Sequence, residues 1–88
     1  MNNYPAPPRN SQEVFDFPGH GEYIACSVVH NQNTRQLMAF RKLRLAMGER
    51  RFRECLVEAI DILARSTGID SPAGWLYAFL DTEAKGQD

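Results

Sequence analysis

Residues 49–66 read ERRFRECLVEAIDILARS, and their apolar side chains recur every three or four positions. That spacing places the apolar side chains along one face of an α-helix, opposite a charged face, and predicts an amphipathic helix packed on a core. The apolar stripe consists of Phe52, Cys55, Leu56, Ala59, Ile60 and Leu63. We therefore expect this helix to be central to the fold, with Leu56 and Leu63 near the middle of its buried stripe.

A second helix is predicted over 34–47, just before this segment. Asn33 or Thr34 can cap its first turn, and no Pro or Gly interrupts the helical period until Gly48. Gly48 either ends this helix or lies inside one long helix, where glycine costs about 1 kcal/mol relative to alanine. We favour the interruption, which gives two separate helices.

A third helix is predicted over 72–84, where Ser71 and Pro72 form a typical start. Its apolar side chains occupy every direction around the helix, so it must be covered on more than one side. The cover is either the rest of the domain or a second copy of the chain, and the sequence is compatible with both. The candidate residues for an interface in such a homodimer are Trp75, Tyr77 and Phe79.

Two shorter runs near the N-terminus, 13–17 and 22–29, are rich in Val, Phe, Tyr and Ile, which favour strands. The turn-forming sequence PGHG separates them, so the pattern predicts a β-hairpin. The expected fold class is therefore α+β and helix-dominant, with an N-terminal β-hairpin packed on the three helices.

The length of 88 residues is typical of one small domain. Residues 1–12 contain three prolines and few apolar side chains, and we expect them to form a flexible arm. The globular domain is then predicted over 13–84, followed by a short tail at 85–88. The hydrophobic fraction of 43% is ordinary for a folded domain.

Positive charge is concentrated in one segment. Seven of the ten Lys and Arg residues lie between Arg35 and Arg53, where Glu49 is the only acidic residue. The segment carries a net charge of +6, whereas residues 1–32 and 54–88 carry −2 and −5. Such a local concentration predicts a surface that binds something acidic, even though the whole chain has a net charge of −1.

Two kinds of partner fit this surface. The first interpretation is a small regulatory protein that docks the basic helices on nucleic acid, where the cations neutralise phosphates. The alternative is a protein-binding modulator or inhibitor, of the type found among phage and plasmid accessory proteins, with Met38 and Leu45 as apolar anchors against an acidic protein. A third possibility is a structural subunit whose arginines pair within the chain. The candidate binding residues are Arg35, Met38, Arg41, Lys42, Arg44, Leu45, Arg50, Arg51 and Arg53.

Motifs for catalysis and metal binding are absent from the sequence. It contains no glycine-rich phosphate loop, no nucleophile elbow and no H-E-x-x-H, so we expect no enzymatic activity. Cys26 and Cys55, with two histidines, do not have the spacing of zinc ligands, and both thiols are expected to be reduced and buried. We predict no cofactor, no metal and no membrane segment, and a cytoplasmic location.

Overall fold

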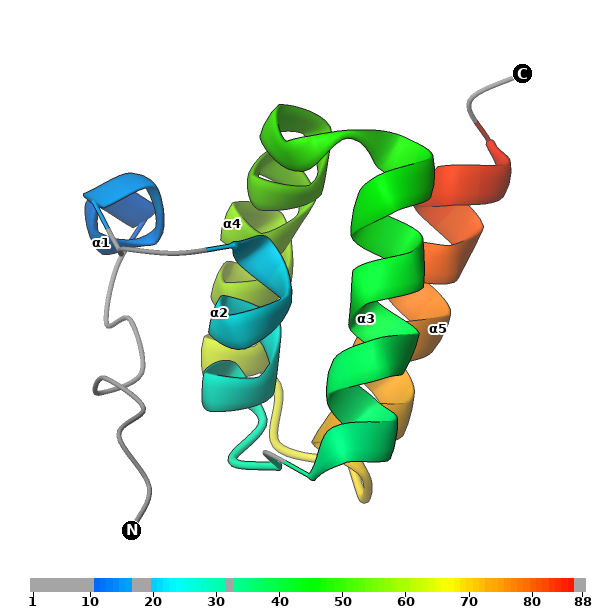
Figure 1. Ribbon diagram of the computed structural model, residues 1–88. Helices are drawn as coiled ribbons and strands as arrows, with labels where there is room; N and C mark the ends of the chain where they lie inside the picture. The colour runs from blue at the N-terminus through cyan, green and yellow to red at the C-terminus, as the bar shows by residue number, and fades with distance from the viewer. Residues whose placement is uncertain (1–10, 17–19, 32, 87–88) are drawn as a thin grey trace, which may run out of the picture.

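The computed structural model describes residues 11–16, 20–31 and 33–86, and these residues form helices and their connections without a strand. The helices are α1 (Ser11–Asp16), α2 (Gly21–Val28), α3 (Thr34–Met47), α4 (Glu49–Arg65) and α5 (Pro72–Lys85). In Figure 1, α3 and α5 run side by side in the same direction and α4 runs the opposite way. The short helix α2 packs against both α3 and α4, and α1 contacts α4.

The predicted β-hairpin, and with it the α+β fold class, is wrong. The run at 22–29 forms α2 instead, and most of the run at 13–17 lies in α1. Strand propensity is a weak preference that tertiary packing overrides. A lone two-stranded hairpin is only marginally stable, whereas a helix satisfies its own backbone hydrogen bonds while burying Ile24, Ala25 and Cys26 in the core.

The three predicted helices are present, with ends within one residue of those expected. The side chain of Asn33 caps α3 by accepting a hydrogen bond from the Gln36 backbone N–H at 2.8 Å. Gly48 separates α3 from α4 with a φ of 93°, a backbone conformation that glycine adopts without strain. Ser71 caps α5 by accepting from the Gly74 N–H at 3.3 Å.

The first helix overlaps the last two residues of the predicted arm. Helix α1 begins at Ser11, inside the segment 1–12 that was expected to be an arm, and residues 1–10 lie outside the described part of the chain. Val14 is fully buried and belongs to the core cluster, while Arg53 donates a hydrogen bond from Nη1 to the Val14 carbonyl oxygen at 2.8 Å. These two contacts hold α1 against α4.

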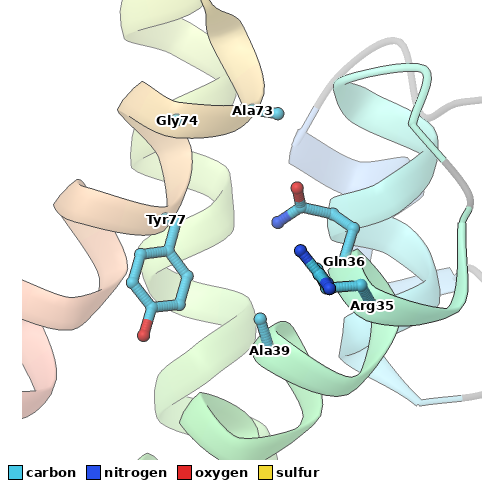
Figure 2. Close-up of a pocket in the computed structure, with 6 residues that line it drawn as sticks. All are labelled: Arg35, Gln36, Ala39, Ala73, Gly74 and Tyr77. Atoms are coloured by element: carbon cyan, nitrogen blue, oxygen red, sulfur yellow. The ribbon is translucent and has the colours of Figure 1, made fainter.

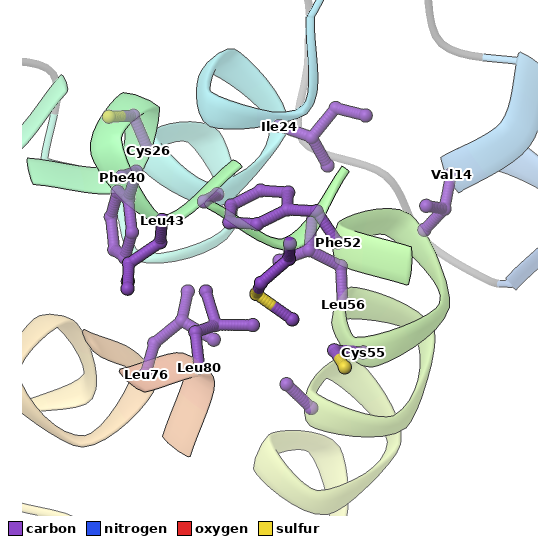
Figure 3. Packing of buried hydrophobic residues seen from close by; sticks show 13 residues of the cluster. Val14, Ile24, Cys26, Phe40, Leu43, Phe52, Cys55, Leu56, Leu76 and Leu80 are labelled. Carbon is purple, nitrogen blue, oxygen red and sulfur yellow. The ribbon is translucent and has the colours of Figure 1, made fainter. Parts of the chain in front are cut away.

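The core lies between α2, α3, α4 and α5, as Figure 3 shows. On α4, the first four residues of the predicted stripe are buried, and Ile60 and Leu63 are half-buried. The largest apolar side chains of the core are completely buried, and they are Phe40, Phe52, Ile24, Leu56, Leu76 and Leu80.

The start of α2 packs unusually closely on α4. Gly21 is buried, and a Cβ atom at this position would lie 2.6 Å from Cδ2 of Phe52. Real Cβ atoms essentially never approach a neighbour so closely. Glycine at position 21 therefore allows the first turn of α2 to rest directly on the Phe52 ring, which brings the next residue, Glu22, into the interior.

Candidate functional site: the arginine-rich helices and the outer face of α3

Glu22 binds two of the arginines that were expected to contact a partner. Its carboxylate is fully buried on α2. Arg41 donates from Nε to Oε2 at 2.8 Å, and Arg44 donates from Nε to Oε1 at 2.5 Å. The two arginines are three residues apart on α3, so both reach α2 from the same side of the helix. Arg41 also donates from Nη2 to the hydroxyl of Tyr23 at 3.2 Å.

The charges in this cluster keep Glu22 ionised. Burial alone would raise the pKa of the Glu22 carboxyl, but hydrogen bonds from Arg41, its own backbone and Arg44 outweigh that effect and lower its pKa below the ordinary value. The same contact with Glu22 raises the pKa of Arg41. The result is a charged triad at the boundary of α2 and α3 rather than a pair of arginines exposed to solvent.

Glu49 at the start of α4 extends this cluster. Arg53 donates from Nε to Oε2 of Glu49, and Nη1 of Arg44 lies 3.6 Å from Oε1 of the same carboxylate. Nδ1 of His20 lies 3.9 Å from Oε1 of Glu49. Because Arg44 contacts both Glu22 and Glu49, one continuous set of ion pairs joins α2, α3 and α4.

Arg50 and Arg51, at the start of α4, also pair within the chain. Arg50 donates to Glu54 at 3.3 Å in the next turn of α4, and Arg51 donates to Glu83 of α5 at 3.0 Å. Three of the four acidic partners lie outside the basic segment, so counting charges along the sequence missed them. Arg41, Arg44, Arg50, Arg51 and Arg53 are therefore all engaged in ion pairs.

Four of the predicted binding residues are arranged differently: Arg35, Met38, Lys42 and Leu45 follow one another at spacings of three and four residues on α3. We call this row the outer face of α3. Met38 is 47% exposed and Leu45 is 68% exposed. Within the described part of the chain, neither Arg35 nor Lys42 has an ion pair. The outer face thus combines exposed apolar side chains with two cations that have no ion pair among the described residues.

A pocket with a volume of about 320 Å³ adjoins this face, between the first turns of α3 and α5. Figure 2 shows the α3 residues on one side and the α5 residues on the other. The ring of Tyr77 forms one wall and is itself 6.4 Å from the ring of buried Phe40. The sequence could not predict the pocket, because it depends on how α3 and α5 pack. Its lining residues are Arg35, Gln36, Ala39, Ala73, Gly74 and Tyr77.

The three residues expected at a dimer interface lie in two separate places. Trp75 and Phe79 stack on each other, with ring centroids 5.2 Å apart and planes inclined by 15°, and both are half-buried against the core. Tyr77 instead lines the pocket beside α3. The structure contains one copy of the chain, so the homodimer stays a prediction.

The cysteines were expected to be reduced and buried, and both are free and buried. Burial, with a smaller contribution from the charge of Glu22, raises the pKa of the Cys26 thiol to about 11. Burial likewise raises the pKa of Cys55. The thiols are therefore protonated at neutral pH and poorly suited to nucleophilic chemistry.

Comparison with known proteins found no matching family model, no matching curated protein and no matching solved structure. Among the described residues, no group of three or more His, Cys, Asp or Glu side chains could hold a metal ion. The helices of these same ranges are too short or too polar to cross a membrane.

Proposed function

We propose that this chain is a small non-enzymatic protein-binding module that docks the outer face of α3 on an acidic protein partner. The observation that supports this proposal is the combination of exposed Met38 and Leu45 with Arg35 and Lys42, which have no ion pair within the described residues. Exposed apolar side chains flanked by charges are typical of binding surfaces, where apolar anchors contribute affinity and charges select the partner.

The partner's chemistry follows from the same four residues. Carboxylates on the partner would neutralise Arg35 and Lys42, and apolar side chains would cover Met38 and Leu45. Methionine suits such a contact because its flexible thioether adapts to irregular surfaces. A partner covered in this way would be modulated or inhibited through occupation of its own acidic surface.

Nucleic acid is the weaker candidate. A phosphate would have to displace the buried carboxylate of Glu22 to reach Arg41, and that of Glu22 or Glu49 to reach Arg44. The two unpaired cations, Arg35 and Lys42, would give few phosphate contacts, and affinity for nucleic acid rises with the number of phosphates neutralised. The net charge of −1 adds no long-range attraction.

The test begins with affinity capture from a nuclease-treated lysate and continues with the purified captured protein. Dissociation constants are measured for the wild type and for Leu45→Asp and Lys42→Glu. We expect Leu45→Asp to weaken binding about 30-fold, as truncation of an interface anchor does. Lys42→Glu should weaken it by about fivefold to tenfold, mainly through a slower association rate at low salt.

Two matched variants serve as controls. Phe15→Asp makes the same change at an exposed apolar residue on α1, and Arg65→Glu makes the same change of two charge units at an exposed position on α4. Both should bind with unchanged affinity. Equal dissociation constants for all variants would exclude the outer face as the binding surface. A salt-sensitive complex with duplex DNA, weakened on replacing Arg35 and Lys42, would instead support the nucleic-acid interpretation.

A further inference from the structure

We propose that the pocket between α3 and α5 holds one apolar side chain of the partner segment, with a neighbouring carboxylate of that segment paired to Arg35. This inference rests on the proposed function and specifies which part of the partner would enter the surface. The pocket lies between the first two turns of both helices, and Arg35 of the outer face is one of its lining residues.

The size and walls of the pocket suit a single side chain. Ala39, Ala73 and Gly74 leave the space between the two helices open, and the ring of Tyr77 closes one side. That ring lies with its centroid 6.4 Å from that of buried Phe40 and is 39% exposed. A volume of about 320 Å³ lies at the lower end of the range for ligand pockets, which is too small for a large cofactor.

The polar groups at the pocket favour a negative charge. The guanidinium of Arg35 has only donors. The side-chain oxygen of Gln36 already accepts from Nδ2 of Asn31 at 3.5 Å, so its amide nitrogen is the group left to donate. No acidic residue lines the pocket. A carboxylate at the mouth of an apolar pocket therefore complements what the chain presents.

Continuity with the outer face identifies the occupant as part of a protein. Arg35 belongs both to the outer face and to the pocket lining, and Ala39 lies one turn further along α3. A segment that covers Met38 and Leu45 would therefore pass the mouth of the pocket. We assign the pocket to an apolar residue of that segment, next to an aspartate or glutamate.

The pocket can be tested without the partner, by titrating ¹⁵N-labelled protein with 3-phenylpropionate, which combines an apolar group with a carboxylate. We expect shifts of the Ala39, Gly74 and Tyr77 amides with a dissociation constant of about 1 to 10 mM, ordinary for so small a ligand. The neutral 3-phenylpropionamide should bind about two to five times more weakly, as expected when an exposed ion pair is lost. Arg35→Gln should remove this difference, while Arg50→Gln should keep it.

A second pair of variants links the pocket to the partner. Ala73→Leu fills the pocket and should abolish the shifts and weaken binding of the purified partner about tenfold. Ala78→Leu makes the same change at an exposed position of α5 and should alter neither the amide shifts nor the affinity for the partner. This inference would be overturned if the pocket amides did not shift, or if the acid and the neutral amide bound equally well. The proposed function would still stand in that case if Leu45→Asp impaired partner binding. Micromolar affinity for the free acid would identify a small-molecule site and overturn the protein-segment occupant.

Discussion

Glu22 determines which arginines of α3 are free to meet a partner. Both of its carboxylate oxygens are occupied, one by Arg41 and one by Arg44. Any acidic ligand for these arginines would compete with a carboxylate that is already desolvated and in position. Arg41 and Arg44 therefore stabilise the contact between α2 and α3, and the proposed binding surface uses Arg35 and Lys42 instead.

Removing the charge of Glu22 should destabilise the fold. Glu22→Gln preserves the size of the side chain but leaves the guanidinium of Arg44, only 14% exposed, with Glu49 as its remaining ionic partner. We expect the free energy of unfolding to fall by about 2 to 4 kcal/mol in urea denaturation. Glu58→Gln, on the exposed side of α4, is the control and should match the wild type. An unchanged midpoint for Glu22→Gln would mean that desolvation cancels the ion pairs.

The same carboxylate should make stability depend on pH. The pKa of Glu22 is below its ordinary value of 4.5 in the folded protein, so the unfolded chain binds this proton more readily. The stabilisation from Glu22 is therefore complete above about pH 4.5 and is lost as the pH falls through the lowered pKa. The gap in unfolding free energy between the wild type and Glu22→Gln should shrink as the pH falls from 7 to 3. A gap that stays constant would contradict this assignment.

The sequence indicates which side chains of α3 are exposed but not which residues the arginines pair with. The exposure of Met38 and Leu45 follows from their place on the helical period of 34–47. The pairing of Arg41 and Arg44 with Glu22 spans 19 and 22 residues, and it depends on α2 being a helix that rests on α3. Because 22–29 was assigned to a strand, that contact could not be foreseen.

At the scale of elements, the long helices were predictable and the short ones were not. The segments 34–47 and 49–66 carry several turns of apolar period, and 34–47 and 72–84 begin with the caps Asn33 and Ser71. Helix α2 has only eight residues, and six of them are buried on several sides, so no apolar stripe distinguishes it from a buried strand. Its β-branched and aromatic residues then gave the wrong prediction.

The central position of α4 can be tested at Leu56. This side chain of α4 is fully buried in the core. Leu56→Ala should lower the free energy of unfolding by about 2 to 5 kcal/mol, through lost burial and the cavity left behind. Val57→Ala, one residue further along at a half-buried position, should cost less. A denaturation midpoint for Leu56→Ala close to that of the wild type would mean that α4 buries a different face.

At the scale of the whole molecule, the fold places acidic side chains from other parts of the chain beside the arginines of the basic segment. The basic segment meets Glu22 of α2 and Glu83 of α5, which come from the acidic parts of the chain. Such pairing is what the interpretation of a structural subunit, whose arginines pair within the chain, requires. Fewer cations are consequently available to a partner than the sequence of the basic segment suggests.

An all-helical domain with short connections should fold quickly. A single residue, Gly48, joins α3 to α4, and most packing contacts form between helices close in sequence. Helical domains of this kind fold in about microseconds to milliseconds, whereas fold classes rich in strands take up to about seconds. Trp75, the only tryptophan, stacks on Phe79 and should report the transition by fluorescence in temperature-jump experiments. A main phase lasting seconds would contradict this topology.

The close approach of Gly21 to Phe52 also constrains how this sequence can diverge during evolution. Any larger residue at position 21 would collide with the Phe52 ring unless that ring were replaced by something smaller. Descendants of this chain should therefore change the two positions together, or neither. A glycine followed by glutamate, with a phenylalanine 31 residues after the glycine and arginines at the spacing of Arg41 and Arg44, is then a signature by which distant relatives can be recognised.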